Sequence, residues 1–148
     1  MKRIYLKEKT IQGLSTRTNN SNEFDPKTSK IGKLHHTFDT QVTVNYKEGA
    51  RVYAIYYDFA SDMHGDYTVL AGTDTVESTQ TTLEEVHTVE GEYLCFKAKG
   101  EVPAIVFEAW QKVWDYFQDA KLEAQRAYTT DFEYYKSTDE IEIYISMK

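Results

Sequence analysis

The order of predicted secondary-structure elements occurs twice along the chain, and this repetition is the strongest constraint on its fold. Residues 4–72 and 83–147 each predict a strand, a helix and two further strands. The Tyr-Tyr pairs at 56–57 and 134–135 occupy matching places, each followed by a short polar turn and a last strand. A period of roughly 70 residues is too long for a solenoid. The pattern predicts an α+β domain of two βαββ repeats with pseudo-twofold symmetry, antiparallel sheets, one helix per repeat and a central ligand groove.

The boundaries of these elements follow from local signals. Asp25-Pro26 predicts the start of the first helix, because Asp accepts a hydrogen bond from a free backbone N–H and proline fits the first turn. The second predicted helix opens at Pro103 and runs to about Lys121. The threonine-rich segment 73–82 is interpreted as a crossover between the halves. Strands are predicted over six ranges: 4–17, 51–59, 67–72, 92–98, 130–136 and 141–147.

Length and charge limit the number of domains and the kinds of partner. A chain of 148 residues favours one domain, spanning 1–148, because two would each approach the size at which a core becomes marginal. The 17 Lys and Arg residues against 24 Asp and Glu residues give a net charge of −7. Because nucleic acids and anionic membranes are bound by basic surfaces, neither is an expected partner.

The chain carries no signal for export, disulfides or metals. Cys95 is the single cysteine, which excludes an internal disulfide and a multi-cysteine metal site. The histidines match no metal-ligand spacing, and no cofactor-binding motif is present. The first residues lack the apolar segment of a signal peptide, and no apolar run approaches the ~20 residues of a transmembrane helix. We expect a cytoplasmic protein without metal or cofactor.

Strand alternation predicts which side chains face away from the helices. The isoleucines between 141 and 145 share a face, which we assign to the core beneath the helix. Phe132 and Tyr134 are the expected partners on that face, which places Glu133 on the opposite, helix-free face. The repeat alignment sets Ile55 beside it. The helix-free faces are then predicted to present one carboxylate among mainly aromatic side chains: Tyr53, Ile55, Tyr57, Glu133, Tyr135 and Tyr144.

A carboxylate among tyrosine rings favours a particular ligand. The ring faces attract cations, and a carboxylate where water is scarce attracts them more strongly than at an open surface. A flat, lipophilic cation is therefore the ligand that such a site prefers. In the alternative interpretation Glu133 is a solvated strand residue and the tyrosines are ordinary β-formers.

Six segments then resemble a known family in their order and spacing: VYAIY at 52–56, GDYTVLAG at 65–72, EGEYLCF at 90–96, AWQKVWDYF at 109–117, DFEYY at 131–135 and IEIYI at 141–145. Over about residues 4–147 the chain is similar to the GyrI-like effector-binding domains, and most of all to the stand-alone integron-cassette effector-binding proteins. The resemblance implies two βαββ repeats around a groove that binds small molecules, often lipophilic cations. It also implies a central acidic residue in a Phe-Glu-x-Tyr strand, which Glu133 matches.

Two features qualify this resemblance. Relatives with an N-terminal helix-turn-helix segment are transcription regulators; here the first predicted strand begins almost at Met1, so we expect no direct DNA binding. That branch commonly has a tryptophan after the leucine of its first helix, whereas this chain has His35. If His35 lines the groove, the groove is more polar and its binding is sensitive to pH, because histidine titrates near neutrality.

On the second predicted helix, Trp110 and Trp114 share a face with Val106 and Phe117, because residues four apart lie one above the other. Such a stripe is typical of a core. The indole N–H needs a partner when it is buried, so we expect Trp110 to reach the edge of the groove.

Two other functions stay open. A carboxylate in an apolar groove suits acid–base chemistry, and some GyrI-like proteins look like hydrolases of strained cyclopropane compounds. The candidates here are Glu133 with Tyr53, Tyr57 or Tyr135. The resemblance also includes a member linked to inhibition of DNA gyrase, so an interaction module for gyrase or a transcription factor is a third hypothesis. The preferred reading is a non-enzymatic binder of aromatic cations.

Overall fold

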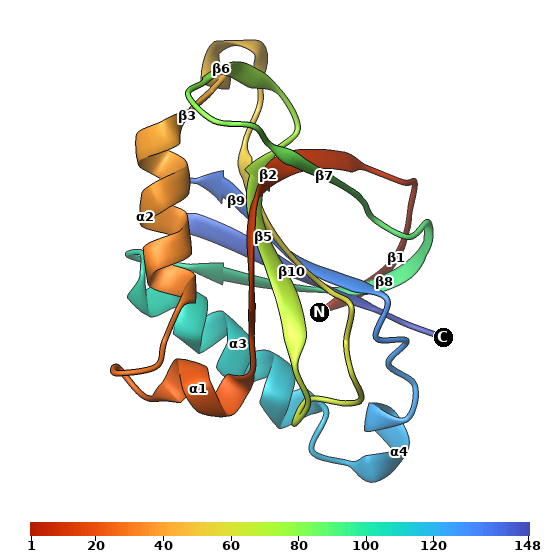
Figure 1. Ribbon diagram of the computed structural model, residues 1–148. Helices are drawn as coiled ribbons and strands as arrows, with labels where there is room; N and C mark the ends of the chain where they lie inside the picture. The colour runs from red at the N-terminus through yellow and green to blue at the C-terminus, as the bar shows by residue number, and fades with distance from the viewer.

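The computed structural model describes residues 1–148 and shows one eight-stranded sheet with a small two-stranded sheet beside it (Figure 1). Along the large sheet the strands follow the order β1-β8-β10-β9-β4-β5-β2-β7, and each neighbouring pair is antiparallel. Its strands are β1 (Lys2–Leu6), β2 (Thr10–Thr18), β4 (Val52–Tyr57), β5 (Tyr67–Thr73), β7 (Glu84–His87), β8 (Gly91–Lys99), β9 (Thr130–Ser137) and β10 (Glu140–Ser146). The small sheet pairs β3 (Val42–Val44) with β6 (Val76–Thr79).

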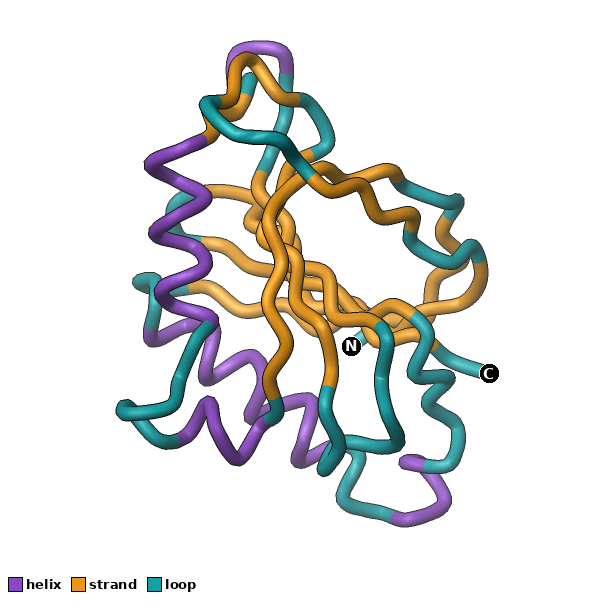
Figure 2. The backbone as a smooth tube through the Cα atoms, viewed as in Figure 1, coloured by secondary structure: helices purple, strands orange, loops and turns teal.

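Two helices, α2 (Ile31–Gln41) and α3 (Ala104–Tyr116), lie on one side of the large sheet (Figure 2). Helices α1 (Asn20–Phe24) and α4 (Ala120–Glu123) are short, as is the 3-10 helix η1 (Tyr46–Glu48). Apart from the short elements α1, β3, η1 and α4 that lie between them, the elements β2-α2-β4-β5 and β8-α3-β9-β10 both run strand, helix, strand, strand. The predicted α+β class, with an antiparallel sheet and one long helix in each half, is confirmed.

Three buried clusters hold the layers together. The first packs α3 against β8 and β10, with Ile143 fully buried. The second packs Phe38 of α2 against Ala54 and its neighbours on β4 and β5. The third contains no helical residue and surrounds Ile55 and Phe132 on the other side of the sheet. The central strands are therefore buried on both faces, which removes the usual contrast between an apolar and a polar face.

Several predicted boundaries are wrong. The expected strand 4–17 is two strands separated by the charged segment 7–9. β1 lies at one edge of the sheet, whereas β2 lies next to the strand at the opposite edge. Asp25 does not start a helix; it ends α1, and its carboxylate accepts a hydrogen bond from the N–H of Lys27 in a turn. The crossover 73–82 contains β6, which pairs with β3. The second helix ends at Tyr116 rather than Lys121.

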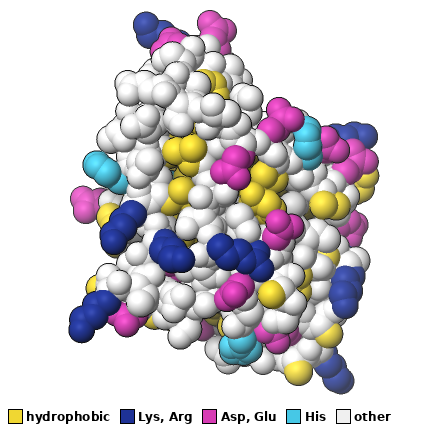
Figure 3. Space-filling view, viewed as in Figure 1, with side chains coloured by type: hydrophobic (Ala, Val, Ile, Leu, Met, Phe, Trp, Pro, Cys, Tyr) yellow, Lys and Arg dark blue, Asp and Glu magenta, His cyan; other side chains and the backbone are white.

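Charge of both signs is distributed over the surface. On the face shown in Figure 3, Lys and Arg side chains lie among Asp and Glu side chains, with apolar side chains between them. None of the helices has the length and apolar character needed to cross a membrane.

Glu23, on α1, caps the start of α2. Its carboxylate accepts hydrogen bonds from the backbone N–H groups of Lys30 and Ile31 and from the Thr18 hydroxyl, whereas Lys30 itself supplies no side-chain cap. Since losing a cap costs about 0.5–2 kcal/mol, Glu23→Ala is expected to lower the free energy of unfolding by about 1–2 kcal/mol in urea titrations. Glu108→Ala, at an exposed position of α3, is the control, with an expected change below about 0.5 kcal/mol. Equal effects of the two variants would contradict the capping role.

Candidate functional site

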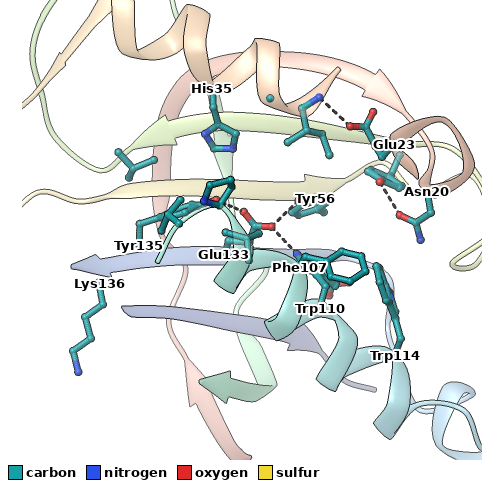
Figure 4. A pocket seen from close by; sticks show the side chains of 18 of the residues that line it. Asn20, Glu23, His35, Tyr56, Phe107, Trp110, Trp114, Glu133, Tyr135 and Lys136 are labelled. Carbon is teal, nitrogen blue, oxygen red and sulfur yellow. Dashed lines mark hydrogen bonds between the residues drawn. The ribbon is translucent and has the colours of Figure 1, made fainter. Parts of the chain in front are cut away.

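A cavity of about 1190 Å³ lies between α2 and α3, over the centre of the sheet. Small-molecule sites mostly measure about 300–1,000 Å³, so this one has room for a large organic ligand. Of its 28 lining residues 15 are hydrophobic, which favours an apolar ligand. The side chains at its centre come from four elements: His35 from α2, Trp110 from α3, Tyr56 from β4, and Glu133 and Tyr135 from β9 (Figure 4).

Glu133 lies in the wall of this cavity with only 1% of its surface exposed. One carboxylate oxygen accepts hydrogen bonds from the Tyr56 hydroxyl, at 2.8 Å, and from the Trp110 indole N–H, at 2.6 Å. The other accepts one from the Tyr135 hydroxyl, at 2.7 Å (Figure 4). These three donors replace the water that the carboxylate loses on burial. All three bonds are accepted by Glu133, as expected for an ionised carboxylate, which has no donor of its own.

The two tyrosines that hold Glu133 are neutral donors. Burial raises the pKa of both Tyr56 and Tyr135 well above the usual value near 10, and the negative charge of Glu133 raises each pKa further. Both phenols therefore keep their protons at neutral pH and keep donating to the carboxylate.

The negative charge of Glu133 has no counter-ion within the protein. None of the ion pairs involves this residue. The cationic side chains of the cavity wall have other partners: Arg126 pairs with Asp131, Lys136 pairs with Glu140, and Arg51 donates to backbone carbonyl groups. The cavity thus presents a carboxylate that is hydrogen-bonded but not neutralised.

Four of the predicted ligand-binding residues lie on the other side of the sheet. Tyr53 and Ile55 belong to the helix-free cluster, Tyr57 and Tyr144 pack against it, and none of the four lines the cavity. The prediction that they share a groove with Glu133 is therefore wrong.

A one-residue shift in the expected register caused this error. Ile143 lies directly opposite Glu133, so both side chains point toward the helices, whereas the prediction gives that place to apolar Phe132. The predicted repeat alignment, which sets the pair at 56–57 against the pair at 134–135, is also shifted by one residue. In the structure Tyr56 shares the helix-covered face with Tyr135 and not with Tyr134. A shift of one residue moves every side chain of a strand to the opposite face.

The same register decides which tyrosines can act with Glu133. Tyr135 contacts the carboxylate of Glu133. Tyr53 and Tyr57 lie on the opposite face of the sheet, so neither of these two tyrosines can serve as a catalytic partner of Glu133. Tyr56, which the sequence reasoning does not assign to the site, is the second phenol in contact. Correct pairing of β4 with β9 would have identified Tyr56. In that pairing Ala54 lies opposite Glu133, and Tyr56, two residues further along β4, points to the same face.

The structure places His35 and Trp110 in the cavity, as the sequence suggests for both. The His35 ring lies edge-on to Tyr135, with 5.8 Å between ring centroids, and its Nε2 is buried without a hydrogen-bond partner. Trp114 also lines the cavity, with its ring 6.1 Å from that of Trp110. The core side of α3 is formed instead by Ile105, Ala109 and Val113.

Metal and thiol chemistry find little support. No group of three or more His, Cys, Asp and Glu side chains is placed to hold a metal ion. Cys95 is buried in β8, and this burial raises the pKa of its thiol. A thiol of raised pKa is a poor nucleophile at neutral pH.

A cavity built between two helices and a central sheet, with aromatic walls and a buried acid that has no ion-pair partner, defines a small-molecule-binding domain. Residues 4–147 match the model of the integron-associated effector binding proteins. The chain belongs to this family.

Solved structures agree with this assignment. An integron cassette protein from the mobile metagenome of Vibrio cholerae, VCH_CASS2, is 35% identical with a TM-score of 0.88; the match covers 99% of this chain and 95% of that one. A second structure, SAV2435 bound to tetraphenylphosphonium, is 15% identical with a TM-score of 0.65, covers 99% and 93% of the two chains, and shows the similarity of fold alone. No curated protein gave a significant match.

Proposed function

We propose that the protein is a non-enzymatic binder of lipophilic aromatic cations, with Glu133 as the countercharge in the cavity. The observation that carries the proposal is a buried carboxylate with three neutral donors and no cationic partner. A charge of this kind is costly to bury, and a cation entering the cavity would compensate for it.

Charge and walls together support this ligand class. At an effective dielectric constant of about 20, a cation about 5 Å from the carboxylate gains about 3 kcal/mol of attraction. The rings of Tyr56, Tyr135 and Trp110 surround the carboxylate, and aromatic faces attract cations as well as apolar groups. A lipophilic cation satisfies both requirements, whereas a strongly hydrated amine would have to lose its water. The ligand bound by SAV2435, tetraphenylphosphonium, is a cation of this class.

The test is calorimetric titration with tetraphenylphosphonium and with tetraphenylborate, which has the same four-ring shape and the opposite charge. We expect wild type to bind the cation and not the anion. Glu133→Gln is expected to weaken binding of the cation at least 30-fold, because the charge attraction is lost while the volume of the side chain is kept.

Glu142→Gln is the matched control. Glu142 is also a buried strand carboxylate that accepts a hydrogen bond from a tyrosine, Tyr144, but it does not line the cavity. Its substitution should leave the affinity within about twofold. Equal affinity of wild type for the two tetraphenyl ions, or of a folded Glu133→Gln variant for the cation, would reject the proposal.

A further inference from the structure

Exposed apolar side chains line part of the cavity wall. Seven large hydrophobic residues of the protein are exposed, and four of them, Phe24, Tyr46, Val102 and Phe107, line the cavity. Phe24 is 61% exposed and Phe107 is 54% exposed. Scattered exposed apolar residues are ordinary, but exposed rings that touch one another in the wall of a cavity mark a binding surface.

Phe24 and Phe107 come from different helices and meet over Trp114. The Phe24 ring lies edge-on to Phe107 with 6.4 Å between centroids, and 5.6 Å from Trp114. Phe107 and Trp114 are 6.1 Å apart in the same manner. These three rings, from α1 and α3, are called the outer aromatic cluster.

The outer aromatic cluster continues directly into the site around Glu133. Trp114 lies 6.1 Å from Trp110, and Trp110 donates to the carboxylate. In Figure 4 the Trp114 side chain lies on the far side of Trp110 from Glu133. A row of rings thus leads from the solvent-exposed edge of the cavity to its buried charge.

The exposed ring of Phe24 is held in place by polar anchors at both ends of its short helix. Asn19 accepts a hydrogen bond from the N–H of Asn22, and Asn20 accepts one from the Tyr67 hydroxyl. At the other end Glu23 binds the start of α2. A helix fixed in this way keeps Phe24 beside Phe107 and Trp114 although 61% of the side chain is exposed, which lowers the cost of ordering the ring when a ligand binds.

We propose that the outer aromatic cluster is a second subsite, which holds a distal aromatic ring of an elongated cation whose charged end lies at Glu133. This inference rests on the proposed function and adds the shape of the ligand to it. The class of ligand is a cation with at least two aromatic units in a row, rather than a compact cation with one ring. An aromatic occupant is favoured because Phe24 and Phe107 are more than half exposed, at the outer end of a row of partly buried aromatic rings.

The experiment compares benzyltrimethylammonium with its para-biphenyl homologue, which differs by one distal ring. In wild type the second ring is expected to tighten binding about tenfold. Phe107→Ala and Phe24→Ala should each reduce this gain to about twofold and leave the affinity for benzyltrimethylammonium unchanged. Both side chains are more than half exposed, so the variants should fold, which circular dichroism checks. Tyr5→Ala, at an exposed aromatic residue outside the cavity, is the control and should keep the full gain.

Each outcome decides between the two proposals. A gain from the second ring that is unchanged in both phenylalanine variants overturns the outer subsite and leaves the role of Glu133 standing. An equal loss for both ligands also overturns it, because the rings would then only shape the inner site. If wild type binds neither ammonium ion, the outer subsite fails, and the tetraphenylphosphonium titration decides the proposed function separately. If Glu133→Gln binds the ammonium ions as wild type does, the proposed function fails and the outer subsite fails with it.

Discussion

Replacing Asp131 by Ala is expected to lower the free energy of unfolding by about 3–5 kcal/mol, the cost typical of breaking a buried ion pair from one side. Asp131 is 1% exposed and Arg126 is 5% exposed. The carboxylate accepts a hydrogen bond from the Arg126 guanidinium at 2.9 Å, and from the backbone N–H and the hydroxyl of Ser146 at 2.7 and 2.9 Å. Without it the guanidinium keeps one carboxylate, Glu123 at 3.8 Å, and the rings of Phe117 and Tyr128.

Two further variants separate the charge from the hydrogen bonds. Asp131→Asn keeps an acceptor for Ser146 and removes the charge. Its free energy of unfolding should therefore lie between those of wild type and Asp131→Ala. Asp115→Ala, at an exposed position of α3, is the control and should change the free energy of unfolding by less than about 0.5 kcal/mol. The measurement is urea unfolding at pH 7. A loss for Asp131→Ala no larger than that of the control would show that the pair contributes nothing to stability.

The order of the elements could be predicted from the sequence because each half carries strong local signals. The aromatic and β-branched runs of β4 and β9 favour strands, and the apolar pattern of α3 has the period of a helix. Glu133 stood out because a single carboxylate interrupts the aromatic segment 132–135, and because the resemblance assigns an acidic residue to that position.

The face on which Glu133 lies could not be predicted in the same way. Strand parity needs a polarity difference between the two faces, and β4 carries apolar or aromatic side chains on both: Ala54 and Tyr56 toward the helices, Tyr53 and Ile55 away from them. Polarity alone then favours Phe132 over Glu133 as the partner of Ile143. The true arrangement depends on three donors that satisfy the buried carboxylate, and two of them, Tyr56 and Trp110, come from distant segments.

The outer aromatic cluster was also beyond sequence reasoning. Helix α1 has five residues and contains two asparagines and a serine, which local signals assign to a loop. Its position depends on Glu23, which binds the start of α2, and on Asn20, which binds Tyr67 on β5, far along the chain. Phe107 could be placed on a helix, but only the tertiary structure shows that α1 lies beside it.

Alkaline pH should destabilise the protein steeply, by about 5 kcal/mol between pH 9 and pH 11. Four tyrosines in or near the core, Tyr53, Tyr56, Tyr67 and Tyr135, have a pKa raised far above 10, in each case chiefly because burial disfavours the charged phenolate. In the unfolded chain they ionise near pH 10. Each therefore contributes stability that is complete below pH 10 and is lost as the pH rises above it, at about 1.4 kcal/mol per pH unit.

This loss is a large share of the total, because a domain of this size is stable by about 5–15 kcal/mol. Urea unfolding at pH 8, 10 and 11 measures it, and absorbance of the phenolate form reports ionisation. We expect the buried tyrosines to ionise together, at the pH where the protein unfolds. A free energy of unfolding that stays constant from pH 8 to 11 would contradict the burial of these phenols.

Tyr53→Phe removes one ionisable hydroxyl that makes no hydrogen bond within the protein. The Tyr53 side chain is 5% exposed and has Phe132 and Tyr134 as ring neighbours, so phenylalanine should pack in its place. The variant removes one group that ionises on unfolding, so the slope of stability against pH above pH 10 should become shallower by about 1.4 kcal/mol per unit. Stability near neutral pH should change little. Tyr56→Phe should show the same change of slope, but with an added loss at neutral pH, because Glu133 would lose one of its three donors.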